Sequence, residues 1–111
     1  MDDLVERLSQ GEHPIEVGGT KPTLENLKER VGDMGYVFIK FTDTRGGTDL
    51  GVRVDKQATD LSKADFERCS GVAHIEGTLT LNYVKVRCVA DIDLATLTGS
   101  GHLVALEEVH F

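Results

Sequence analysis

The residues best suited to chemistry lie in the C-terminal third of the chain. His74 and Asp91 stand in two runs of alternating apolar and polar residues, separated by a short stretch at 82–83. A histidine held by a carboxylate can act as a general base, because the carboxylate fixes the imidazole tautomer and raises its basicity. Arg87 and Tyr83 lie between them and could stabilise an anion. His74, Asp91, Arg87 and Tyr83 are therefore the candidate site residues.

These side chains meet only if the two runs form a hairpin. The apolar residues fall on odd numbers in the first run and on even numbers from Val84 to Leu94. A two-residue turn at Asn82-Tyr83 accounts for this change, since the residues that flank such a turn face each other. The predicted apolar pairs are Leu79 with Val86, Gly77 with Cys88, Ile75 with Ala90 and Ala73 with Ile92. The predicted polar pairs are His74 with Asp91, Thr78 with Arg87 and Thr80 with Lys85, with Glu76 diagonal to Arg87.

An ordinary solvated sheet face would give the same pattern. Cross-strand charge pairs on such a face contribute roughly 0.2–1 kcal/mol each. A catalytic role requires the polar face to be concave and covered, with His74 as the base and Asp91 orienting it. The opposite face is the more apolar one, which favours the solvated interpretation.

Other reactive residues predict structure rather than chemistry. The stretch 42–48 has the acid, threonine and glycine of an anion-binding loop, but an alternating run follows at once, which predicts a hairpin turn. Cys69 and Cys88 form no CxxC motif, and we expect two free thiols, with Cys88 in the core. No pair of histidines has metal-ligand spacing, so we predict no metal site at His13, His74, His102 or His110.

The rest of the chain predicts three short helices and more strands. Helices are expected over 2–9, over a stretch from Pro22 to about Val31, and over 62–69, where Ser-Lys-Ala-Asp resembles a capping box. A brief strand is expected at 15–17, and 36–42 with 50–55 predicts a hairpin. A turn at Gly99-Ser100-Gly101 should precede a last strand from His102 to about Val109, which is either buried on both faces or bulged at Glu107-Glu108.

Together these elements predict one α+β domain over residues 1–111. Its order is α-β-α-β-β-α-β-β-β, with a mainly antiparallel, five- to six-stranded sheet of hairpins and two to three short helices on one face. Three short helices cannot cover both faces of such a sheet. An exposed face or edge must then be polar, charged or paired with another subunit.

The composition limits the classes of partner. Twelve Lys and Arg against 19 Asp and Glu give a net charge of −7, spread along the chain. A negative field of this kind makes nucleic acid and membrane surfaces poor partners. No apolar run approaches the roughly 20 residues of a membrane span, and no signal peptide is evident, so we expect a cytoplasmic protein.

Two functions remain open at the level of sequence. The first is a small, non-enzymatic binding module that self-associates as a homodimer through its sheet or binds another protein. The second is a small-molecule-binding or isomerase-like domain with a pocket over a curved sheet, using His74, Asp91, Tyr83 and Arg87. We predict no cofactor for either, and the first is favoured because no motif specific to an enzyme is present.

Overall fold

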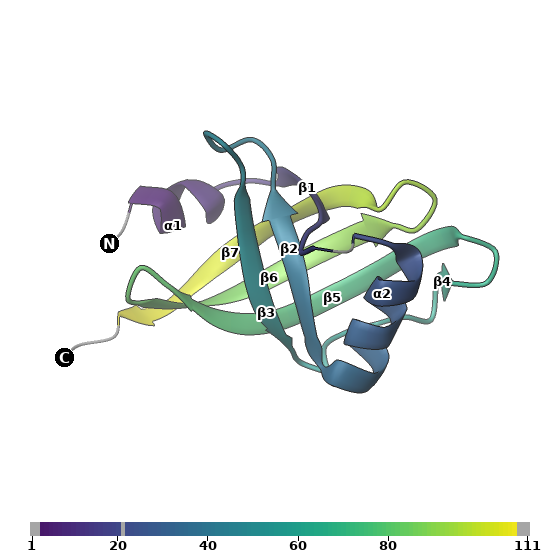
Figure 1. Cartoon of the computed structure of the whole chain (residues 1–111). Helices are drawn as coiled ribbons and strands as arrows, with labels where there is room; N and C mark the ends of the chain where they lie inside the picture. The colour runs from purple at the N-terminus through teal and green to yellow at the C-terminus, as the bar shows by residue number, and fades with distance from the viewer. Residues whose placement is uncertain (1–2, 21, 109–111) are drawn as a thin grey trace.

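Residues 3–20 and 22–108, which the computed structural model describes, form a closed β-barrel of six antiparallel strands with one short extra strand and two short helices (Figure 1). The helices are α1 (Asp3–Leu8) and α2 (Leu24–Glu29), and a π-helical turn at Arg30–Met34 follows α2. No helix in the described residues is long and apolar enough to cross a membrane. The strands are β1 (His13–Val17), β2 (Tyr36–Phe41), β3 (Thr48–Val54), β4 (Ala64–Asp65), β5 (Ser70–Leu81), β6 (Val84–Asp93) and β7 (Thr98–Glu108).

The predicted antiparallel sheet is confirmed, but the expectation of an open sheet with helices on one face is wrong. The strands follow the order β3-β2-β1-β7-β6-β5, and β5 returns to β3 through the pairs Arg53 with Thr78 and Val54 with Gly77. A twisted sheet that curls onto itself covers its own apolar face, so short helices suffice. Gly77 permits the closing contact, because a Cβ atom there would collide with the carbonyl oxygen of Arg53.

Both predicted hairpins are confirmed, and so is the register predicted for the hairpin of β5 and β6. In β5–β6 every predicted pair is present, from Ala73 with Ile92 to Leu79 with Val86. Asn82 and Tyr83 have φ angles of 49° and 65°, the left-handed values that a two-residue hairpin turn of type I′ requires at both positions. The β2–β3 hairpin pairs Val37 with Val52 and Ile39 with Leu50, which places both apolar faces inside the barrel.

The predicted third helix over 62–69 is wrong. This segment contains β4, which pairs with Ser70–Gly71 at the start of β5, so the chain forms a small hairpin there. The side chain of Asp65 accepts hydrogen bonds from the backbone N–H groups of Glu67 and Arg68. Bonds of this kind compete with helix formation and favour a turn.

The predicted turn at Gly99-Ser100-Gly101 is also wrong, because these residues belong to β7. The chain reverses just before them, where Leu97 has a φ angle of 59° and donates its N–H to the carbonyl of Asp93. Gly99 serves close packing instead, since a Cβ atom there would collide with the carbonyl oxygen of Asp91. The predicted bulge exists, but Leu106 is the extra residue, between Ala105 opposite Val86 and Glu107 opposite Lys85.

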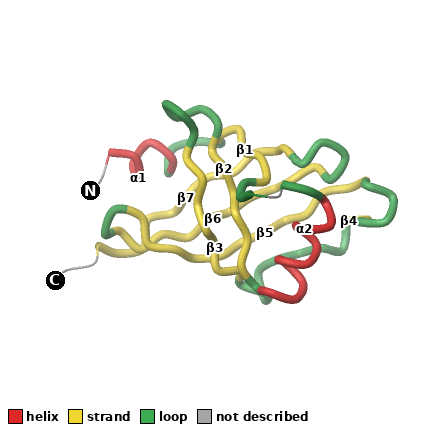
Figure 2. The backbone as a smooth tube through the Cα atoms, in the orientation of Figure 1, coloured by secondary structure: helices red, strands yellow, loops and turns green. Residues whose placement is uncertain are grey.

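The two helices lie at opposite sides of the barrel and add buried residues to its aliphatic core (Figure 2). In α1, Val5 and Leu8 are fully buried. Asp2, which the sequence placed in this helix, lies outside the described residues, and so does Val109, which the sequence predicted as the end of the last strand. α2 starts at the Thr23 cap, whose hydroxyl accepts the N–H of Asn26, and buries Leu27. The π-helical turn adds Val31 to the core and ends at Gly35 in a left-handed conformation.

Candidate functional site

Three of the four candidate residues occupy one stretch of the outer barrel surface on β5 and β6. His74 lies opposite Asp91, and Arg87 lies opposite Thr78, as the sequence predicts. Their inward neighbours Ile75, Cys88 and Ala90 are buried, so the polar residues point away from the barrel interior. The face that was considered as a pocket floor is therefore the outside of the barrel.

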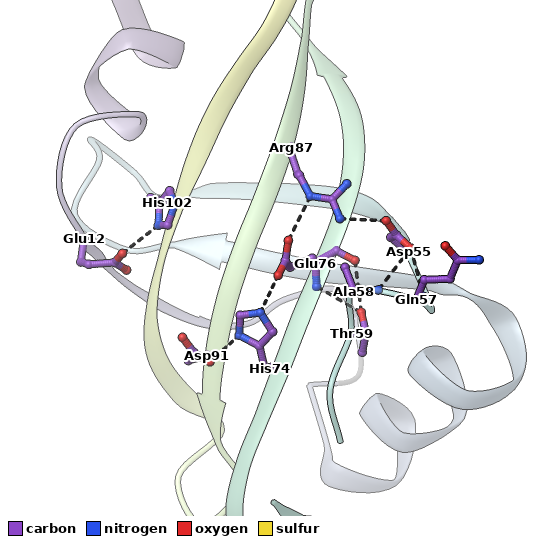
Figure 3. Close-up of polar contacts among 10 residues, drawn as sticks. All are labelled: Glu12, Asp55, Gln57, Ala58, Thr59, His74, Glu76, Arg87, Asp91 and His102. Atoms are coloured by element: carbon purple, nitrogen blue, oxygen red, sulfur yellow. Dashed lines mark hydrogen bonds and ion pairs between the residues drawn. The ribbon is translucent and has the colours of Figure 1, made fainter. Parts of the chain in front are cut away.

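The side chains of this face form a continuous chain of charged contacts, which we call the charge network: Asp91, His74, Glu76, Arg87 and Asp55 (Figure 3). His74 Nδ1 lies 2.7 Å from Asp91 Oδ1, and His74 Nε2 lies 2.6 Å from Glu76 Oε2. Arg87 donates from Nε to Glu76 at 3.0 Å and from Nη2 to Asp55 at 2.8 Å. The network thus joins β5 and β6 to the end of β3.

The loop that follows β3 is bonded to β5 beside the same network. The N–H of Asp55 donates to the carbonyl of Glu76 at 2.8 Å, and the hydroxyl of Thr59 bonds both backbone groups of Glu76. Asp60 and His74 exchange two backbone hydrogen bonds. The carboxylate of Asp55 also accepts the N–H groups of Gln57 and Ala58, which fixes the loop's first turn. The loop therefore extends the contact between β3 and β5 beyond the last strand pair.

The network shifts the acidity of its members. The carboxylates of Glu76 and, secondarily, Asp91 raise the pKa of His74 above its ordinary value of 6.5. His74 and Arg87 in turn lower the pKa of Glu76, and Arg87 lowers the pKa of Asp55. Hydrogen bonds to the charged form cause these shifts, because each ionised group finds a partner of opposite sign.

This arrangement favours a structural role for His74. Carboxylate oxygens only accept hydrogen bonds when ionised, so an imidazole between two of them is best satisfied with both nitrogens protonated. Such an imidazolium presents no free nitrogen to a substrate. An opening of about 390 Å³ adjoins His74 and Asp91, and Asp60, Lys63 and Val72 line the rest of it.

The fourth candidate, Tyr83, lies apart from the network at the tip of the β5–β6 hairpin, where its side chain is 65% exposed.

The other described histidines also face carboxylates. His13 Nδ1 lies 2.7 Å from Asp43, which raises the pKa of His13. His102 Nδ1 lies 2.8 Å from Glu12 in an ion-pair contact that lacks hydrogen-bond geometry (Figure 3). His110 lies outside the described residues, within which no group of three potential metal ligands gathers.

The anion-loop stretch and the cysteines fit the structural interpretations. Residues 42–47 form the turn between β2 and β3, and Thr48 begins the returning strand. Both cysteines are free. Cys88 is buried in the core, and burial raises the pKa of its thiol to about 12.

A second surface feature was not predicted from the sequence. On one side of their two closing pairs, β3 and β5 part and leave a groove of about 620 Å³, which we call the seam groove. Tyr36, Gly51 and Arg53 line one wall, and Thr78, Thr80 and Lys85 line the other. Strands β3 and β5 are far apart in the sequence, so no local sequence pattern predicts their contact. Asp55 was missed in the charge network for the same reason.

Comparison with known proteins adds no family to these observations. No protein-family model matches the sequence, and no curated protein is significantly similar to it.

Proposed function

We propose that this protein is a non-enzymatic binding module that self-associates through the outer face of its sheet near the end of β7. The observation that carries this proposal is a pair of exposed aliphatic side chains on that face. Val104 and Leu106 are 41% and 49% exposed, although the protein has a well-filled aliphatic core elsewhere. We call these two residues the β7 patch.

The surroundings of the patch support a protein contact. Val89 on β6 is half-buried and lies on the same outer face, diagonal to Val104 in the ladder. Exposed aliphatic residues that cluster on a sheet face are typical of interaction surfaces. The charge network flanks the patch through Arg87, which lies directly opposite Val104. An apolar centre with a charged rim is the usual composition of a protein interface.

The edge of β7 supports self-association in particular. β1 pairs with β7 through Thr98–Gly101, and no described strand pairs with the same edge from His102 onward. An unpaired edge beside an apolar patch can meet the same surface of a second copy in a two-fold symmetric contact. Helix α1 also contacts β7, but among the described residues no strand adds to this part of its edge.

Sedimentation velocity of the full chain across the micromolar range tests the proposal. We expect a species of twice the 12.1 kDa chain mass, and we expect Val104→Glu to convert it to monomer. Val72→Glu is the matched control, because Val72 is also 41% exposed but lies on β5. A monomer at every concentration, or an equal effect of both substitutions, would contradict self-association through the β7 patch.

A further inference from the structure

We propose that the seam groove binds an extended peptide segment with acidic side chains, which adds as a strand to the open edge of β3. This site goes beyond self-association, since it lies at the β3 edge of β5 whereas the β7 patch lies on β7. The proposal rests on unpaired backbone groups, on hydrogen-bond donors without partners, and on the sign of the charges in the groove.

The backbone of β3 offers a template for a strand. Asp55 donates its N–H toward β5, and Val54 donates its N–H to Gly35 on the opposite side. Since successive residues of a strand alternate in direction, the odd-numbered residues of β3 point their N–H and C=O groups toward β5. Asp49 and Gly51 lie beyond the closing pairs, so in the described structure their groups face the groove without a strand partner.

The side chains of the groove are donors that the described residues leave unused. The Tyr36 ring lies over Gly51, where a Cβ atom would collide with its hydroxyl. Among the described residues, no hydrogen bond or ion pair engages the Tyr36 hydroxyl or the hydroxyls of Thr78 and Thr80. The same holds for the charged groups of Arg53 and Lys85 within the described part of the chain.

The charges of the groove favour an anionic occupant. Its one acidic lining residue, Asp49, already accepts the N–H of Gly19 at 2.9 Å. Glu107 lies opposite Lys85 in the ladder, on the side of Lys85 away from β5. Although the chain carries a net charge of −7, salt limits the reach of distant charges to about 8 Å at physiological ionic strength. The nearby Arg53 and Lys85 therefore determine that the groove prefers an anionic occupant.

The groove also favours a peptide over a free anion. Leu79 and Leu81 line it and are incompletely buried, so they offer apolar contacts between the polar ones. A strand with alternating apolar and acidic residues would place one set on these leucines and the other toward Arg53 and Lys85. Main-chain hydrogen bonds to Asp49 and Gly51 would supply affinity that a free carboxylate lacks.

Titration of the ¹⁵N-labelled full chain with acetyl-Val-Glu-Val-Glu-Val-amide tests the site. We expect saturable shifts of the amide signals of Gly51 and Thr80. Three further probes separate the contributions: the same peptide with Lys for Glu, the same peptide N-methylated at alternate residues, and free glutamate. We expect each to bind at least about tenfold more weakly, because each loses charge-assisted or main-chain hydrogen bonds.

Variants of the protein locate the contact. Arg53→Glu should weaken the acidic peptide about tenfold or more, whereas Arg45→Glu makes the same change of charge on the exposed β2–β3 turn and should leave binding unchanged. Because Arg53 also belongs to a closing pair, Lys85→Glu serves as a second variant away from the closure. Absence of binding, equal binding of the lysine or methylated peptide, or equal shifts with glutamate would overturn the proposal, and none of these results bears on the oligomeric state.

Discussion

Strand β5 makes two junctions that differ greatly in extent. Its contact with β6 runs through ten residue pairs, from Val72 with Asp93 to Leu81 with Val84, whereas its contact with β3 in the described structure consists of two. The first joins neighbours in sequence across a tight turn. The second joins distant segments and closes the barrel.

At the short β3–β5 junction, hydrogen bonds from the loop after β3 take the place of further strand pairs. Beyond Val54 with Gly77, the loop after β3 is held to β5 by Asp55, Thr59 and Asp60. The charge network then ties Asp55 to Arg87 on β6. The polar cluster that resembled a catalytic site thus lies where closure has the fewest strand pairs, which gives these residues a structural reason to be there.

The largest effect should come from breaking the closure itself. Gly77→Val places a side chain against the carbonyl oxygen of Arg53 and the side chain of Val52. We expect a loss of about 3 kcal/mol in the free energy of unfolding, because backbone atoms cannot move aside cheaply. Urea unfolding measures it. Thr78→Val, one residue along and facing outward, is the control and should change stability by no more than about 0.5 kcal/mol.

A smaller effect should follow from removing the charged group of Arg87, which links β6 to Asp55 at the end of β3. Arg87→Met keeps the stem but leaves Glu76 and Asp55 without their guanidinium partner. We expect a loss of about 1 kcal/mol, since the network is only partly exposed and contains several coupled charges. Lys85→Met on the same row of β6 is the control. Equal losses in the two variants in urea unfolding would show that the network does not support closure.

At the longer β5–β6 junction, a substitution of Tyr83 in the turn should increase stability. Tyr83 adopts a φ angle of 65°, which is unfavourable for a bulky residue. Asn-Gly is the preferred sequence for this type of turn. We expect Tyr83→Gly to raise the free energy of unfolding by about 0.5 kcal/mol. A loss in stability of the same size in thermal unfolding would mean that the contacts of the Tyr83 ring outweigh the backbone strain.

The smallest effect should be a pH dependence at the short junction. Because the pKa of His74 is raised above 6.5, its contribution to stability is complete below pH 6.5 and is lost as the pH rises through the folded-state value. Glu76, whose pKa is lowered from 4.5, contributes above pH 4.5 and loses its contribution as the pH falls through its folded-state value. Stability from this pair should therefore be greatest between pH 4.5 and 6.5.

Urea unfolding of His74→Gln at pH 5.5 and pH 8 measures this effect. We expect the variant to lose less stability than the wild type between these values. Since the pKa of His13 is also raised, the double variant His13→Gln, His74→Gln should show a still weaker dependence. An unchanged pH dependence in His74→Gln would show that ionisation of His74 does not contribute to the stability of the β3–β5 junction.

Much of the candidate site could be predicted because it depends on one local hairpin. The parity change around Asn82-Tyr83 predicts that His74 faces Asp91 and that Glu76 lies diagonal to Arg87, and both are confirmed. Asp55 could not be found in this way, because its contact with Arg87 depends on the return of β3 to β5. The role of Gly99 was likewise misjudged, since glycine suits both a turn and a strand that passes close to its neighbour.

Alternation of apolar and polar residues was enough to predict both hairpins, their inner and outer faces and the register of β5 with β6, because alternation is a local property with a period of two. Three features followed only from the folded structure: the closure of the sheet, the presence of β4 and turns instead of a helix over 62–69, and the groove between β3 and β5. Each of these depends on which distant backbones come together, and that choice is made by the shape of the whole core rather than by any one segment.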